Sequence, residues 1–395
     1  MLKKISLLTN YNLYESKRHF TEKLAEALKR KNIETQIIDA REGALGADVI
    51  GAIQRFAPDV TASFNSLDPI AEKKFLWDFL ETPHISFLVD PVFYSTFLVE
   101  SPYSIMTCVD RSDLSAVSSH NFSNAFFWPH AVEKELAAPK NADRPLDVVF
   151  LGSCYDYESL RVSWQQRNPA AINKVLDDAI DIVFSDERVS LAQALVQAWN
   201  ATGNDPQGVD FMTLYYYLDN YTRGKDRVEL IRSIKDTQIH VFGELSPDNA
   251  VGILGWAPYL AAQKNVTVHP SVPFNEALQI MKKSKIVLNS MPFFRDGTHE
   301  RIFTALACGC LAITSESIYL REQFREGEGV VFYSSKHREN VSGFIHDIIK
   351  QEPKRREAAA LGREKVLLHH TWDVRVAELL EKLPPILERI NKSII

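Results

Sequence analysis

The chain has no apolar run long enough to span a membrane, no excess of basic residues and few cysteines. A spanning helix needs about 20 predominantly apolar residues, and no segment of the 395 residues comes near this. The net charge of −6 argues against a nucleic-acid binder, whose surface carries a basic stripe. With 45% hydrophobic residues, we expect a globular protein in the cytoplasm or at the periphery of the inner membrane.

The four cysteines are Cys108, Cys154, Cys308 and Cys310. Such a small number is typical of proteins in a reducing compartment. Cys308 and Cys310 lie two residues apart, but no second pair follows at the spacing of a zinc site. No His, Asp or Glu cluster has metal-ligand spacing either. We therefore expect both residues to be buried at a helix-to-strand turn, and we expect no metal and no cofactor.

A chain of this length is expected to form two domains. Strand and helix patterns alternate through residues 1–135, which predicts a doubly wound parallel sheet. A second alternating unit covers 146–372, interrupted by purely helical patterns at about 157–235 that we interpret as an insertion. A final helix occupies 373–395. The predicted fold class is α/β, with two Rossmann-like domains.

The most informative segment is 289–314. An apolar strand pattern at 285–288 runs into a polar loop that contains Gly297, and a helical pattern then begins at Arg301 and ends at Gly309. A helix N-terminus at the carboxyl end of a parallel strand binds anions, because free N–H groups and the helix dipole point there. Arg301 opposes that dipole unless an anion is present, and its guanidinium suits phosphate.

Other polar residues accompany this segment. Arg295, His299 and Glu300 belong to the same loop, although a solvated loop with an acidic first helical turn would explain Glu300 equally. Gly152 and Ser153 follow another strand pattern. They could cradle a phosphate through backbone N–H groups, or the glycine could serve a plain turn.

Strand patterns of the first domain end in polar residues, among them Asn65 and Asp90. Ligands bind beyond such ends in doubly wound sheets. Asp90 could be the general base that activates an acceptor hydroxyl, or a turn residue before Pro91. His130 at the domain junction is the second candidate, and packing beneath the linker would explain it as well.

From Gly297 the chain reads Gly-x-x-x-Arg-x-Phe-x-Ala-x-Ala-x-Gly. This pattern resembles the C-terminal half of GT-B glycosyltransferases, and the CgeB-like "glycosyl transferases group 1" proteins in particular. The resemblance covers about 147–324 outside the insertion. It implies metal-independent transfer of a sugar from a nucleotide-diphosphate sugar, with a UDP-sugar as the expected donor, to a hydroxyl of a glycan, protein or lipid-linked acceptor.

The resemblance also implies roles for single residues. Donor diphosphate and sugar contacts fall on Gly152, Ser153, Arg295, Gly297, His299, Glu300, Arg301 and Thr304. Contacts with the nucleotide base fall on Gly243 and on the loop at His269. Similar proteins usually carry a ribose-binding Glu at the position of Thr304, which offers only one hydroxyl, and Glu300 could take over that role. The last helix is expected to return to the first domain.

Several alternatives stay open. The protein could be a non-catalytic structural protein that binds a sugar or nucleotide, or a sugar-nucleotide epimerase of similar architecture. The helical insertion could shape acceptor binding or form a homo-oligomer contact. Fold-level similarity does not choose among these functions.

Overall fold

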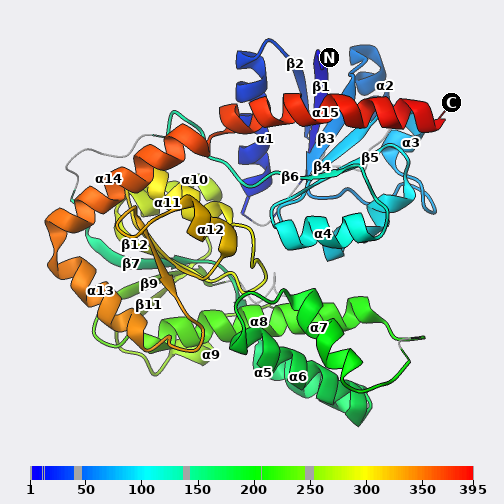
Figure 1. The fold of residues 1–395 in the computed structure, drawn as a ribbon. Helices are drawn as coiled ribbons and strands as arrows, with labels where there is room; N and C mark the ends of the chain where they lie inside the picture. The colour runs from blue at the N-terminus through cyan, green and yellow to red at the C-terminus, as the bar shows by residue number, and fades with distance from the viewer. Residues whose placement is uncertain are drawn as a thin grey trace. The chain divides into compact units, whose positions relative to one another are not determined.

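The structure, a computed structural model, describes residues 2–10, 12, 14–39, 47–136, 143–205, 207–244 and 253–394. The chain divides into two compact units. Unit 1 comprises Met1–Leu136, Pro273–Asn275 and Lys365–Ile395, and unit 2 comprises Ala137–Val272 and Glu276–Glu364. Each unit is built on a six-stranded parallel sheet (Figure 1). The predicted α/β class with two doubly wound sheets is therefore confirmed.

The sheet of unit 1 has the order β2-β1-β3-β4-β5-β6. Its strands are β1 (Lys4–Thr9), β2 (Glu34–Asp39), β3 (Val60–Phe64), β4 (His84–Phe87), β5 (Ser104–Cys108) and β6 (Ala125–Phe127). Its helices are α1 (Ser16–Arg30), α2 (Ala47–Phe56), α3 (Leu76–Leu80), the 3-10 helix η1 (Val92–Glu100), α4 (Arg111–Ser119) and α15 (Trp372–Ile394). The strand order reverses between β1 and β3, and such a reversal opens a ligand crevice at the carboxyl ends.

Helix α1 shows how unit 1 is packed. Phe20, Leu24 and Leu28 recur at every fourth position and are all buried, which gives the helix one apolar face. The helix also contacts α15. There Arg30 donates two hydrogen bonds to the Asp373 carboxylate, at 2.7 and 2.5 Å. Helix α15 thus belongs to the same compact unit as the N-terminal sheet.

The sheet of unit 2 has the order β11-β9-β7-β12-β13-β14. Its strands are β7 (Leu146–Leu151), β9 (Ile239–Glu244), β11 (Val266–Pro270), β12 (Ser284–Asn289), β13 (Leu311–Ser315) and β14 (Val330–Tyr333), and a short antiparallel pair joins β8 (Cys154–Tyr155) to β10 (Ile253–Leu254). The order reverses between β7 and β12. The two segments that follow these strands contain Gly152 and Gly297 respectively, so both leave the sheet at the reversal.

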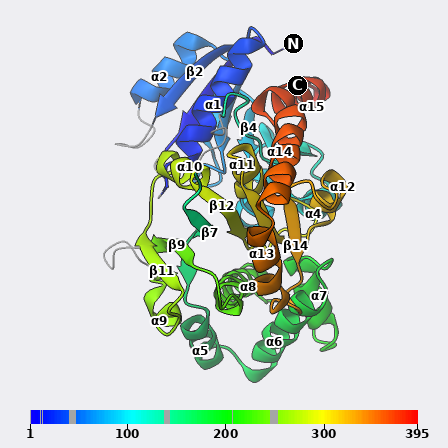
Figure 2. The same ribbon diagram turned by 90° about the vertical axis from the view of Figure 1, so that its left-hand side faces the viewer.

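Four helices separate β7 from β9: α5 (Tyr157–Arg167), α6 (Ala170–Ser185), α7 (Leu191–Asn200) and α8 (Phe211–Ser233). The first three contact α8 and gather around it (Figure 2). Helix α8 leads directly into β9, which is parallel to β7, so α8 is itself the crossover connection that such a pair requires. The helices added to an ordinary βαβ unit are α5 to α7.

The remaining helices of unit 2 are α9 (Ala257–Leu260), α10 (Phe274–Lys282), α11 (Glu300–Ala307), α12 (Ile318–Gln323), α13 (Asn340–Lys350) and α14 (Glu352–His369), of which α10 begins and α14 ends in unit 1. Helix α11 stops where the sequence predicts. Gly309 has a φ of 80°, and the N–H of Cys310 donates to the carbonyl of Ala305 at 2.9 Å, as in a helix ended by a left-handed glycine. Cys308 and Cys310 are buried at this turn, as predicted. Among the described helices, none is long and apolar enough to cross a membrane.

Candidate functional site

The candidate site of unit 2 centres on the start of helix α11. His299 is the N-cap residue, and its Nδ1 accepts a hydrogen bond from the N–H of Arg301 at 3.4 Å. Burial lowers the pKa of His299, and the charges of Arg301 and Arg227 lower it further against the opposing effect of Glu300. The capping bond requires the form of the imidazole in which Nδ1 carries no proton, since a protonated ring nitrogen cannot accept a hydrogen bond.

Arg301 is held at the carboxyl edge of the sheet. The residue is 9% exposed, and Nη1 donates to Oδ1 of Asn289, the last residue of β12, at 2.9 Å. Asn289 in turn donates through Nδ2 to Oγ1 of Thr314 in β13 at 3.0 Å. These bonds fix the guanidinium beside the N-terminus of its own helix, which is the arrangement that favours an anion.

The turn at Gly152 and Ser153 lies against Arg301. A Cβ built on Gly152 would be 3.7 Å from Nη2 of Arg301. The carbonyl of Gly152 accepts a hydrogen bond from Nε1 of Trp256 at 3.0 Å. A Cβ on Gly243 would come within 1.9 Å of this same carbonyl oxygen. Gly243 is therefore required so that β9 can pack closely against the turn.

Helix α8 adds a cation that the sequence analysis missed. Arg227 is 5% exposed, and Nη1 donates to the carbonyl of Ser153 at 2.9 Å. Its Nε is buried, and among the described residues it has no hydrogen-bond partner. One turn earlier, the guanidinium of Arg223 lies 3.6 Å from the ring centre of Phe293 in the loop before α11. Arg223 and Arg227 recur at helical spacing in the sequence, but this spacing does not distinguish them from the other charged residues of the same helix.

Other predicted donor residues lie deeper in the unit. Arg295 is 1% exposed and donates to the carbonyls of Val183 and Val189 at 2.6 and 3.2 Å. These bonds attach the loop before α11 to the end of α6 and to the segment between α6 and α7. Thr304 is buried in the second turn of α11, while Glu300 in the first turn is partly exposed and contacts His299.

His269 lies within β11 instead of starting the following loop. Its Nε2 is 2.9 Å from Nδ1 of His240, and its ring stacks on Phe242 with centroids 4.3 Å apart. The His269 side chain is thus engaged in contacts with two side chains of the neighbouring strand β9. The loop that leaves β11 is tied to the end of β9, since the N–H of Ser271 donates to the carbonyl of Glu244 at 2.8 Å.

In unit 1 the structure brings polar strand ends together. Asp90 is exposed, and Nδ2 of Asn65 donates to its carboxylate at 2.8 Å. Burial lowers the pKa of Lys17, at the start of α1, although the charge of Asp90 opposes this. His130 is 3% exposed, with its ring 6.0 Å from that of Phe20. Asp90 therefore faces solvent at the carboxyl edge, while His130 lies within the aromatic packing.

Comparisons with known proteins agree with this arrangement. Residues 225–381 match the family described as glycosyl transferase-like. No curated protein matches the sequence. The fold is similar to that of sucrose-phosphate synthase from Thermosynechococcus elongatus, with a TM-score of 0.58 and 10% identity over 96% of this chain and 99% of that chain. It is also similar to HepE from Anabaena, solved with UDP and glucose, with a TM-score of 0.57 and 9% identity over 96% and 99%.

A third similar structure is AviGT4, a glycosyltransferase involved in avilamycin A biosynthesis, with a TM-score of 0.51 and 11% identity over 98% of both chains. Two doubly wound parallel sheets, together with this similarity, show that the chain has the GT-B fold. Within this fold, the match to the glycosyl transferase-like family covers residues 225–381. The finer CgeB-like assignment stays a prediction.

Proposed function

We propose that unit 2 binds a nucleoside diphosphate sugar, a UDP-sugar in particular, and that the enzyme transfers this sugar to an acceptor hydroxyl. The observation that carries the proposal is the meeting of Arg227, Arg301, the N-terminus of α11 and the Gly152–Ser153 turn. A buried guanidinium with an unpaired N–H is costly unless a ligand completes its hydrogen bonds. A diphosphate supplies both the negative charge and the acceptor oxygens.

The same groups would support the chemistry of transfer. Negative charge develops on the diphosphate as the bond to the sugar breaks, and preorganised donors aimed at that charge lower the barrier. Arg301, Arg227 and the positive end of the α11 dipole would take this role, and His299 would keep the helix start in place. With two guanidinium groups available, we propose that no metal ion is needed for leaving-group stabilisation.

The remaining donor contacts stay proposals from the family resemblance. Thr304 or Glu300 would bind the ribose, and the ends of β9 and β11, at Gly243 and His269, would approach the base through backbone groups. The UDP in the HepE structure supports the choice of uracil as the base. On the acceptor side, Asp90 is the proposed general base, with His130 as the second candidate, because Asp90 is exposed at a carboxyl edge.

The proposal is tested by calorimetry with UDP and by incubation with a panel of UDP-sugars, with and without a chelator. We expect UDP to bind with the chelator present and at least one UDP-sugar to be hydrolysed slowly without an acceptor. Restoration of a chelator-sensitive reaction by manganese would refute metal independence. Conversion of the donor to its epimer would instead make the protein an epimerase, and UDP binding without any turnover would make it a non-catalytic binding protein.

A further inference from the structure

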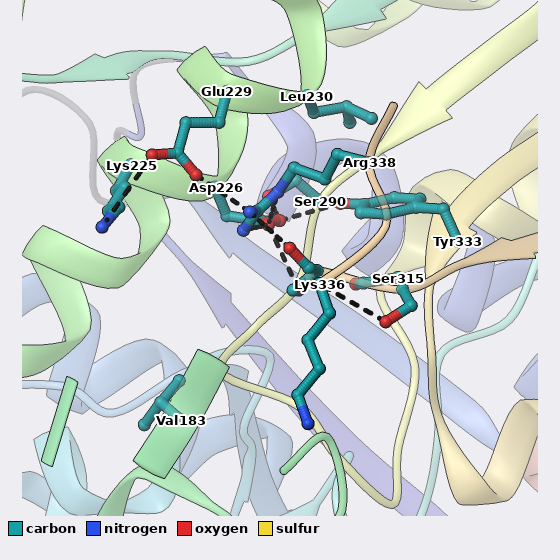
Figure 3. A network of polar contacts seen from close by, with 12 residues as sticks. Val183, Lys225, Asp226, Glu229, Leu230, Ser290, Ser315, Tyr333, Lys336 and Arg338 are labelled. Atoms are coloured by element: carbon teal, nitrogen blue, oxygen red, sulfur yellow. Dashed lines mark hydrogen bonds and ion pairs between the residues drawn. The ribbon is translucent and has the colours of Figure 1, made fainter. Parts of the chain in front are cut away.

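A fully buried carboxylate lies beside the candidate site. The side chain of Asp226 in α8 has no exposed surface. Its Oδ2 accepts hydrogen bonds from Oγ of Ser290 at 2.6 Å and from the hydroxyl of Tyr333 at 2.8 Å. Its Oδ1 accepts from Nε and Nη2 of Arg338 at 3.0 and 2.6 Å. Figure 3 shows these side chains converging from three separate parts of unit 2.

The contacts keep Asp226 ionised. Burial by itself would raise the pKa of the Asp226 carboxyl, but the charge of Arg338 and the hydrogen bonds from Ser290 and Tyr333 outweigh it, so that the pKa lies below its usual range. An ionised buried carboxylate is tolerated only when its oxygens are fully paired. The partners of Asp226 are therefore held in place, because moving one of them away would leave a buried negative charge without a hydrogen bond.

Two members of this network are chain neighbours of two site residues. Asp226 directly precedes Arg227, which binds the carbonyl of Ser153. Ser290 directly follows Asn289, which binds Arg301. The hydrogen bond between Ser290 and Asp226 therefore joins the backbone that carries Arg227 to the backbone that holds Arg301.

We propose that Asp226 is a positioning residue that sets Arg227 relative to Arg301 for the diphosphate of the donor. The inference rests on the proposed function. Two guanidinium groups repel each other in the absence of an anion, so a site that presents both needs an independent constraint on their separation. Asp226 supplies the constraint without touching the ligand, and the gain is preorganisation of the charges before the donor binds.

A purely structural role is the alternative, since buried ion pairs often affect only the stability or the specificity of a fold. The two roles differ in whether the effect of replacing Asp226 on ligand affinity depends on the presence of Arg227. A positioning residue acts through Arg227, so removing Arg227 should abolish its effect on the ligand. A structural residue should lower stability, with an effect on the ligand that is absent or independent of Arg227.

The test is a double-mutant cycle that measures the Kd for UDP by calorimetry and Tm by thermal unfolding. We expect Asp226→Asn to raise the Kd about tenfold and to lower Tm. In the Arg227→Ala background, the same change should lower Tm again but leave the Kd within about twofold. Ser290→Ala, which removes only one of the hydrogen bonds to Asp226, should reproduce this pattern with a smaller rise if Asp226→Asn does not fold.

Glu352→Gln is the matched control. It breaks another ion pair of unit 2, in which Arg355 is 2% exposed, within α14. We expect a lower Tm and an unchanged Kd. An unchanged Kd in folded Asp226→Asn, or an equal rise with and without Arg227, would overturn the inference and leave the proposed function standing. Failure of the unmodified protein to bind UDP would refute the proposed function instead, and the inference with it.

Discussion

Nη2 of Arg301 lies 3.7 Å from the point where a Cβ on Gly152 would stand. The guanidinium thus lies close to a turn residue that carries no side chain of its own, with the ring of Phe150 on the same side at 3.2 Å from that point. A phosphate held by Arg301 would lie close to the turn at Gly152 and Ser153, where the N–H of Gly152 itself donates to the carbonyl of Phe242 at 2.9 Å. One glycine and one arginine, distant in sequence, therefore lie next to each other at the proposed diphosphate site.

Arg301→Ala should weaken UDP binding by about 1.5–3 kcal/mol, the range for a hydrogen bond to a charged group. Calorimetry of the folded variant measures this directly. Arg363→Ala is a suitable control, because Arg363 donates to the carbonyl of Ala307 at the opposite end of α11 and should leave the affinity unchanged. Unaltered UDP affinity in folded Arg301→Ala would remove Arg301 from the donor site.

Gly243→Ala should displace the Gly152 turn, since the added Cβ would meet a backbone oxygen at 1.9 Å. Backbone atoms cannot move aside as a flexible side chain can, so we expect both a lower Tm and weaker UDP binding. Gly343→Ala in α13 provides the contrast. No atom lies within 4 Å of its Cβ position, and replacing a glycine within a helix should stabilise the protein by about 0.5–1 kcal/mol. Equal behaviour of the two variants would show that β9 does not support the turn.

Asp90→Asn should reduce turnover on the order of a hundredfold to ten-thousandfold, the usual contribution of a general base. The amide keeps the shape of the side chain and loses its charge. UDP affinity should be nearly unchanged, because the proposed UDP contacts all lie in unit 2. Asp68→Asn is the control, since Asp68 is another exposed carboxylate near Lys17. Normal turnover of Asp90→Asn would reduce Asp90 to a turn residue and make His130 the next candidate.

His84 should make the stability of the protein depend on pH. Burial lowers the pKa of His84 to about 3, and its ring nitrogens lie 2.8 Å from Oγ1 of Thr61 and 3.1 Å from Oγ of Ser63. The unfolded chain takes up this proton near pH 6.5. The neutral ring therefore makes its full contribution to the free energy of unfolding above pH 6.5. This contribution decreases by about 1.4 kcal/mol per pH unit as the pH falls toward the folded pKa.

Urea denaturation at pH 7 and pH 5 checks this prediction. The unmodified protein should lose about 2 kcal/mol more stability between these two values than His84→Gln does. His337→Gln, which replaces a largely exposed histidine, should behave like the unmodified protein. An identical pH dependence for all three would show that His84 is not held neutral in the folded state.

The sequence by itself determined much of the local structure. The start and end of α11, its inner face and the left-handed Gly309 follow from glycine placement and apolar spacing, which act over a few residues. The same is true of the two doubly wound sheets, because alternating strand and helix patterns leave few other arrangements. The family resemblance within this segment then led to Arg301 and Gly297.

Only the tertiary structure decided which distant residues join them. Arg227 reads in the sequence as one charged residue among many in a helical stretch, and Arg295 reads as a site residue although its guanidinium binds carbonyls at the end of α6. Two further contacts could not be predicted from the sequence. They are the close approach of Gly243 to the Gly152 turn and the hydrogen bond between Ser290 and Asp226. Each depends on how segments far apart in the chain pack together, and periodicity and propensity describe only neighbours along the chain.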